Sequence, residues 1–135
     1  MAFGVKQRNK EGQNTTKPTR FFSKKQEDKV AKTIGGKTTS NSGATMFGGK
    51  GDILTSGKNN DGKGSFLIEC KTKTTHSNSI SIKKEWIEKN RQEMVFEGKE
   101  HQAIVFNFGP DEENHYIIDE YLFLELLDYL SNKSE

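Results

Sequence analysis

The order of apolar and polar positions along this chain predicts a series of short helices and strands. Apolar side chains recur at helical spacing over residues 26–34, 83–96 and 121–130. Alternating or continuous apolar positions predict strands over residues 37–40, 52–54, 65–73, 103–108 and 116–118. The resulting order is α-β-β-β-α-β-β-α. It predicts an α/β fold with a mixed central sheet flanked by helices.

The first helix carries an acidic residue on its apolar side. Ser23 followed by Gln26 is a capping-box pattern that predicts the start of the helix, and Gly35 predicts its end. Glu27 lies three residues before Val30 and therefore on the same apolar side of the helix, so we expect this carboxylate to face inward. The alternative is a first-turn glutamate that complements the helix dipole. Ser79 or Ser81 is expected to cap the second helix.

The strand over residues 65–73 has two chemically different faces. One face carries Phe66, Ile68 and Cys70, and the other carries Leu67, Glu69, Lys71 and Lys73. We expect the first face to be core, which makes the Cys70 side chain a packing residue rather than a nucleophile.

Composition limits the chain to one small domain. Its 135 residues include 29 Leu, Ile, Val and Phe, about 21%, which is close to the level at which chains stop folding. Residues 1–20 are polar and basic, so we expect a flexible arm before a domain over residues 21–135. No run is long enough for a membrane span, and one cysteine excludes a disulfide scaffold. The sequence predicts a soluble, cytoplasmic protein.

Charge divides the chain into two halves. Residues 1–84 carry 17 basic and 6 acidic side chains, whereas residues 85–135 carry 4 and 13. The halves have net charges of +11 and −9. A basic half of this size attracts polyanions, of which nucleic acid is the commonest in a cytoplasm. The alternative is a solvated surface that only keeps the protein soluble.

Asp52, Glu69 and Lys71 are the residues that carry candidate chemistry. The two carboxylates are hard oxygen ligands suited to Mg²⁺, and the backbone carbonyl of Cys70 at the strand edge is a third candidate ligand. The spacing of Glu69 and Lys71 places both on one face of the strand. Hydrolysis of a phosphodiester needs a metal and positive charge near the phosphate. The alternative is a surface salt bridge between Glu69 and Lys71.

Several residues of the basic half are candidate phosphate contacts, and three of them continue from the strand of Glu69 along the chain. They are Arg20, Lys24, Lys25, Lys73, Lys83 and Lys84.

The pattern resembles the PD-(D/E)XK nuclease superfamily, and most closely its archaeal and phage Holliday-junction resolvases. The resemblance covers residues 23–108 and rests on Glu27, Ser42-Gly43, Gly51-Asp52-Ile53, Glu69-Cys70-Lys71 and the apolar run 103–108. It implies a restriction-endonuclease-like core and Mg²⁺ as cofactor, which Mn²⁺ can replace. It also implies a homodimer that binds branched or duplex DNA and makes paired cuts. The resemblance further implies a prokaryotic or phage-infected cell as the setting.

The same resemblance assigns roles to single residues. Asp52 and Glu69 would be metal ligands and Lys71 would orient or activate water. Glu27 would be an auxiliary carboxylate near the metal and a possible ligand, and Ser42 would lie beside the scissile phosphate.

The leading hypothesis is therefore a Mg²⁺-dependent structure-selective DNA endonuclease, a Holliday-junction resolvase acting in DNA recombination and repair. Two alternatives stay open. One is a restriction-like or nicking endonuclease on linear duplex, and the other is a non-catalytic nucleic-acid-binding protein.

Overall fold

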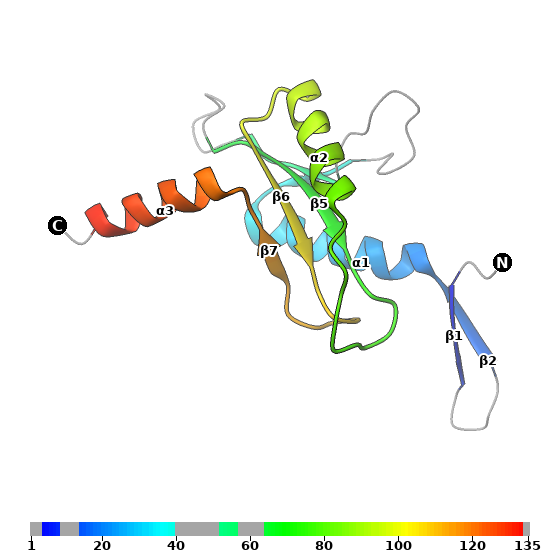
Figure 1. Cartoon of the computed structure of the whole chain (residues 1–135). Helices are drawn as coiled ribbons and strands as arrows, with labels where there is room; N and C mark the ends of the chain where they lie inside the picture. Colours follow the sequence, from blue (N-terminus) through cyan, green and yellow to red (C-terminus); the bar gives the residue numbers. More distant parts are fainter. Residues whose placement is uncertain (1–3, 9–13, 40–51, 57–63, 134–135) are drawn as a thin grey trace.

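A mixed five-stranded sheet forms the centre of the molecule (Figure 1). The computed structural model describes residues 4–8, 14–39, 52–56 and 64–133, with side chains from residue 20 onward. The strands follow in the order β3 (Lys37–Thr38), β4 (Ile53–Leu54), β5 (Phe66–Lys71), β6 (His101–Phe106) and β7 (His115–Ile117). Only β5 and β6 are parallel, and the other neighbours are antiparallel. The mixed α/β fold is therefore confirmed.

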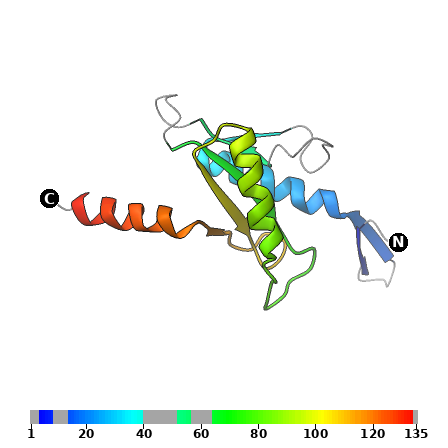
Figure 2. The ribbon, with the colours of Figure 1, turned by 45° about the horizontal axis from the view of Figure 1, so that its top comes forward.

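Three helices accompany this sheet: α1 (Thr19–Ile34), α2 (Lys84–Phe96) and α3 (Glu120–Lys133). Helices α1 and α2 lie on opposite faces of the sheet, whereas α3 extends away from it (Figures 1 and 2). The parallel pair β5 and β6 requires a crossover, which α2 supplies. None of the helices in the described ranges is long and apolar enough to cross a membrane.

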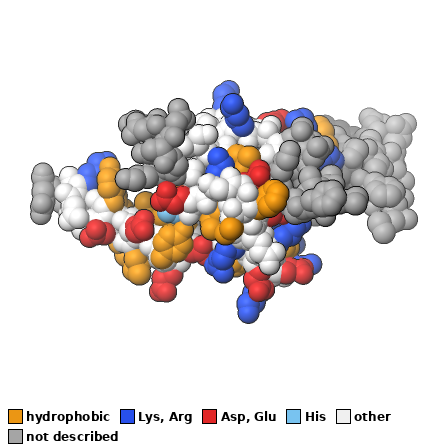
Figure 3. Space-filling view, turned by 90° about the horizontal axis from the view of Figure 1, so that it is seen from above, with side chains coloured by type: hydrophobic (Ala, Val, Ile, Leu, Met, Phe, Trp, Pro, Cys, Tyr) orange, Lys and Arg blue, Asp and Glu red, His pale blue; other side chains and the backbone are white. Residues whose placement is uncertain are grey.

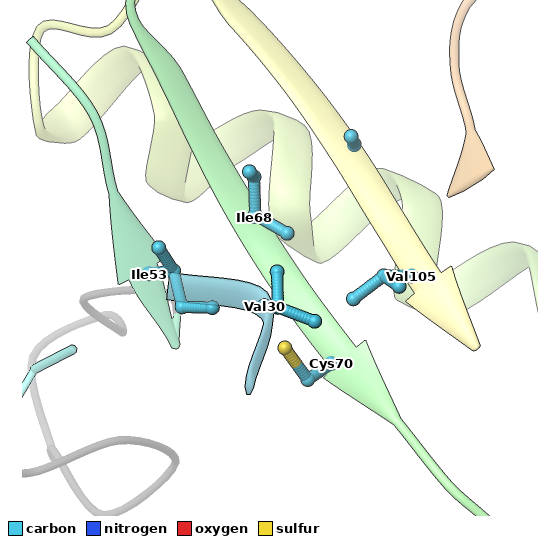
Figure 4. Close-up of a cluster of buried hydrophobic side chains, with 6 residues drawn as sticks. Val30, Ile53, Ile68, Cys70 and Val105 are labelled. Carbon is cyan, nitrogen blue, oxygen red and sulfur yellow. The ribbon is translucent and has the colours of Figure 1, made fainter. Parts of the chain in front are cut away.

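The core lies between α1 and one face of the sheet. Val30 of α1 packs against a cluster of buried side chains that includes Ile53, Ile68, Cys70 and Val105 (Figure 4). This is the face that alternation predicts to be core. The opposite face is also covered, because α2 packs on it and leaves Leu67 fully buried.

Helix α1 begins earlier than the capping-box pattern predicts. Ser23 lies inside the helix, and its hydroxyl donates to the carbonyl of Arg20 (3.2 Å) instead of capping the first turn. Pro18 immediately precedes Thr19, and proline is tolerated at a helix start because it has no N–H to satisfy there. The end of the helix is as expected, since Gly35 adopts a left-handed φ of 73°.

The expected serine cap of α2 is also absent. The residue before the helix is Lys83, which is extended and makes no side-chain capping hydrogen bond. Ser79 and Ser81 lie too far upstream for their hydroxyls to reach the N–H groups of the first turn.

Part of the expected flexible arm forms a hairpin. Strands β1 (Gly4–Arg8) and β2 (Asn14–Pro18) pair antiparallel, with Gly4 opposite Pro18. The pairing supplies partners for backbone N–H and C=O groups without requiring a large apolar core. The hairpin leads directly into α1 (Figure 1).

Candidate functional site

Asp52 lies at the start of β4 and is directed toward β5. Its backbone N–H donates to the carbonyl of Ile68 (3.0 Å), although Ile68 is already the partner of Ile53. Asp52 and Ile53 therefore both face Ile68. Two residues opposite one form a β-bulge, which changes the direction of a side chain. The Oδ2 atom of Asp52 accepts a hydrogen bond from the backbone N–H of Cys70 (2.7 Å). The Asp52 side chain is thereby held against the middle residue of the segment Glu69-Cys70-Lys71.

The environment of Asp52 disfavours its charged form. Burial of the carboxyl, which is 5% exposed, is the main reason that its pKa rises to about 7. The negative charge of Glu69 raises this pKa further, and that of Glu27 adds a smaller effect. The hydrogen bond from Cys70 and the charge of Lys71 act in the opposite direction. A cation bound beside Asp52 and Glu69 would relieve their repulsion.

Glu69 and Lys71 project from β5 on the side that α2 covers. Lys71 Nζ lies 3.3 Å from Glu69 Oε2 and 4.6 Å from the ring centroid of Trp86 on α2. Both charged side chains are largely but not fully buried. They border a hollow of about 420 Å³, whose other walls come from α2. The pair is therefore more enclosed than an ordinary surface salt bridge, and it stays open to a ligand.

Glu27 faces inward, as the helical stripe predicts, and lies 3% exposed. Its Oε2 atom accepts a hydrogen bond from Arg20 Nη1 at 2.6 Å, so this carboxylate is already bound by a cation. The neighbouring Gln26 donates from Nε2 to the carbonyl of Lys71 (2.8 Å), which ties α1 to the end of β5. Glu27 is thus close enough to influence the pKa of Asp52.

Sequence reasoning missed the role of Gln26. Its position between Phe22 and Val30, four residues from each, places it on the buried stripe of α1. That spacing could have identified a polar side chain directed toward the sheet.

The donor set matches the hard oxygen ligands that Mg²⁺ prefers, although the ligands are not gathered around one point. Within the described ranges, no three His, Cys, Asp or Glu side chains lie close enough together to hold a metal ion. Asp52 and Glu69 supply two carboxylates, and a backbone carbonyl can supply a third oxygen. The carbonyls of Phe66 and Ile68 face β4, and Cys70 follows two residues later on that edge.

The thiol of Cys70 has a different environment from its backbone. The side chain belongs to the buried core cluster, and burial raises the pKa of the thiol far above its usual range. It is a packing residue, as expected.

The candidate phosphate contacts fall into two groups. Arg20, Lys24 and Lys25 form ion pairs with Glu27, Asp28 and Asp111 respectively. Among the residues that the structure describes, Lys73, Lys83 and Lys84 have no ion-pair partner. Ser42 and the turn that follows it lie outside the described ranges.

Comparison of the chain with family models, with curated proteins and with solved structures yields no match. The chemistry of the side chains and their positions therefore carries the functional interpretation.

Proposed function

We propose that this chain is a Mg²⁺-dependent DNA endonuclease with a restriction-endonuclease-like core that hydrolyses phosphodiesters in branched DNA, as a Holliday-junction resolvase does. The observation that carries the proposal is the position of Asp52. Its carboxylate is held at the backbone of Cys70 and is electrostatically coupled to Glu69, while Lys71 lies beside Glu69. The element order from α1 to β6 supports the proposal, because the resemblance implies the same order over residues 23–108.

The chain's own residues would have distinct roles. Asp52, Glu69 and the carbonyl of Cys70 would hold the ion, because all three present oxygen to the same part of β5. When bound, Mg²⁺ polarises the phosphoryl oxygen and lowers the pKa of a bound water. The ammonium group of Lys71 would stabilise negative charge on the phosphate and orient the attacking water. Trp86 and Glu69 restrict where that ammonium can lie.

Glu27 would act as a positioning carboxylate rather than as a ligand. Its bond to Arg20 keeps a cation near the acidic residues, and its charge raises the pKa of Asp52. The negative charge of Glu27 favours uptake of a divalent cation beside Asp52, whereas its ion pair with Arg20 weakens that effect.

A cleavage assay tests the proposal. We expect the full chain to cut a labelled four-way junction with Mg²⁺ or Mn²⁺, and to leave it intact with EDTA. A linear duplex of the same sequence should be cut far more slowly. Equal cutting of both substrates would instead favour a restriction-like or nicking endonuclease.

The ion pairs in the site favour a second candidate, a nucleic-acid-binding protein without activity. Glu69 and Glu27 each have a cationic partner in the chain, so neither requires a metal. A calorimetric titration with Mg²⁺ or Mn²⁺, with and without DNA, separates the two candidates. Binding to DNA without metal binding and without cleavage would favour the non-catalytic binding protein.

Lys84 is expected to contact a phosphate. It is the first residue of α2 and lies in the same helical turn as Trp86, whose ring contacts Lys71. It also lacks an ion-pair partner in the described part of the chain. Lys84→Ala should weaken junction binding and reduce the slope of log K against log salt by about 0.9, the loss of one phosphate contact. Binding titrations at several salt concentrations measure this slope.

Lys99→Ala is the matched control for that variant. Lys99 precedes β6, whose start lies opposite Phe66, at the far end of β5 from Lys71. The control should leave the slope unchanged, and equal slopes for wild type and Lys84→Ala would contradict the assignment.

A further inference from the structure

Helix α3 exposes an unusual number of large apolar side chains. Leu122 packs on the rest of the molecule, but seven others are between 45% and 61% exposed. They are Tyr121, Phe123, Leu124, Leu126, Leu127, Tyr129 and Leu130. Figure 3 shows hydrophobic atoms beside acidic ones at the end of the molecule where α3 lies. Apolar patches of this kind mark interaction surfaces.

Most of these side chains share one side of α3. Intervals of four and three residues place Leu122, Leu126 and Tyr129 in one row. The adjacent row consists of Phe123, Leu127 and Leu130, and the two rows together form the apolar stripe of α3. The opposite side carries Glu120, Glu125 and Asp128. The stripe is wider than its single buried residue requires, so it is shaped to pack against a further surface.

The direction of α3 is determined at its first turn. Tyr121 Oη lies 2.9 Å from His101 Nδ1, and Asp119 accepts hydrogen bonds from Arg91 (2.7 Å) and from Gln102 (3.1 Å). These contacts connect the start of the helix to α2 and β6. The exposed stripe is therefore presented in a defined orientation.

The same chain contains an apolar groove. It has a volume of about 830 Å³ and lies between the end of α1, the β4 edge and β7. Its apolar walls include Ile34, Leu54, Phe66, Tyr116, Ile118 and Leu126. Because Leu126 belongs to α3, the groove borders the helix of its own chain.

We infer that α3 of a second copy of this chain occupies this groove, and that the exchange is reciprocal in a two-fold symmetric dimer. Since Leu126 borders the groove of its own chain, the two α3 helices would lie alongside each other across the two-fold axis. In each helix, Leu126 would stay at the edge of the groove of its own chain, and the rest of the stripe would contact the partner.

The exposed area agrees with this occupant. The five exposed side chains on the apolar side of α3, without Tyr121 and Leu124, expose roughly 500 Å², and the groove walls add to this, so the total approaches the ~800 Å² that each partner contributes to a stable interface. One surface that carries both a protruding apolar helix and an adjacent apolar groove is self-complementary, which a two-fold interface requires.

Charge favours the same arrangement. The three acidic residues of α3 lie on its polar side, whereas the groove is bordered by Lys37, and Lys32 lies in the last turn of α1. With its apolar side in the groove, a partner helix keeps these three carboxylates in solvent, so the contact buries none of them. The contact does not involve Asp52, Glu69 or Lys71, so the inference does not depend on the proposed nuclease activity.

Sedimentation velocity of the full chain at micromolar concentration tests the dimer. We expect a species of twice the 15.3 kDa chain mass for wild type. Leu127→Asp/Leu130→Asp on the helix and Tyr116→Lys at the groove should each raise the dimer dissociation constant by about 100-fold or more, because each introduces a charge into the apolar contact. These positions are exposed or at a groove edge, so circular dichroism should show an unchanged fold.

Val95→Asp/Phe96→Asp is the matched control. Both residues are apolar and about 70% exposed at the end of α2, away from the groove. This variant should dimerise as wild type does.

Three results would overturn the inference. A wild-type monomer at all concentrations would mean that no second copy covers α3. A species larger than two copies would exclude the closed reciprocal exchange. Loss of the dimer in the helix variant but not in Tyr116→Lys would mean that the helices pair without entering the groove.

Discussion

Glu69→Gln is expected to lower the rate of Mg²⁺-dependent junction cleavage by about 1,000-fold or more, because it removes one of two carboxylate ligands from the proposed site. The substitution preserves the size of the side chain, so the packing of β5 against α2 should be retained. Binding to the junction should persist or become tighter, since a negative charge near the phosphates is lost. Single-turnover cleavage and a binding titration on the same substrate separate the two effects.

Glu88→Gln provides the control for charge alone. Glu88 is exposed on α2, and the structure shows no ion pair for it within the described ranges. Cleavage by this variant should remain within a few-fold of wild type. Full activity of Glu69→Gln would refute the assignment of Glu69, whatever the behaviour of the control.

Asp52→Asn is expected to stabilise the metal-free protein above neutral pH. The pKa of Asp52 is about 7 in the folded chain, because of burial and the charge of Glu69, against about 4 for an unfolded aspartate. Between these two values the folded state binds the proton and the unfolded state does not. The free energy of unfolding therefore falls as pH rises through this window, and the loss is complete above pH 7.

The size of this loss is roughly 4 kcal/mol, given about 1.4 kcal/mol for each unit by which the pKa differs between the two states. The asparagine variant has no charge to bury, and its amide oxygen can still accept from the N–H of Cys70. Its unfolding free energy should exceed that of wild type at pH 8 by a few kcal/mol and should match it near pH 4. Urea unfolding in EDTA at equal protein concentration measures the difference.

Asp28→Asn is the control for this experiment. Asp28 is exposed and paired with Lys24 at 3.5 Å, so its removal should change stability by less than about 1 kcal/mol. The addition of Mg²⁺ at pH 8 should stabilise wild type but not Asp52→Asn, because only the wild-type carboxylate gains from a cation. Identical pH dependence in wild type and Asp52→Asn would show that Asp52 ionises normally.

Much of the fold could be predicted from local patterns. Alternation along β5 correctly separated the core face of Ile68 from the face of Glu69 and Lys71, and helical spacing correctly directed Glu27 inward. The second helix was expected at 83–96 and spans Lys84–Phe96. These features depend on residues within a few positions of each other, so the sequence contains the whole pattern.

Weaker local signals led to errors at the ends of elements. The pair Ser23 and Gln26 has the spacing of a capping box, but the helix begins at Thr19 because Pro18 ends β2 there. The hairpin of β1 and β2 has almost no apolar pattern, since its order comes from backbone pairing that side-chain composition does not reveal.

The sequence by itself determined the element order from α1 to α3, the two faces of β5 and the residue types available for a metal site. Only the tertiary structure decided that Asp52 binds the backbone of Cys70, that Arg20 engages Glu27, and that α3 leaves its apolar stripe exposed beside a groove. Periodicity reports which side of an element is apolar, because that depends on neighbours along the chain. It does not report which distant segment meets that side, because long-range contacts depend on how all the elements pack at once.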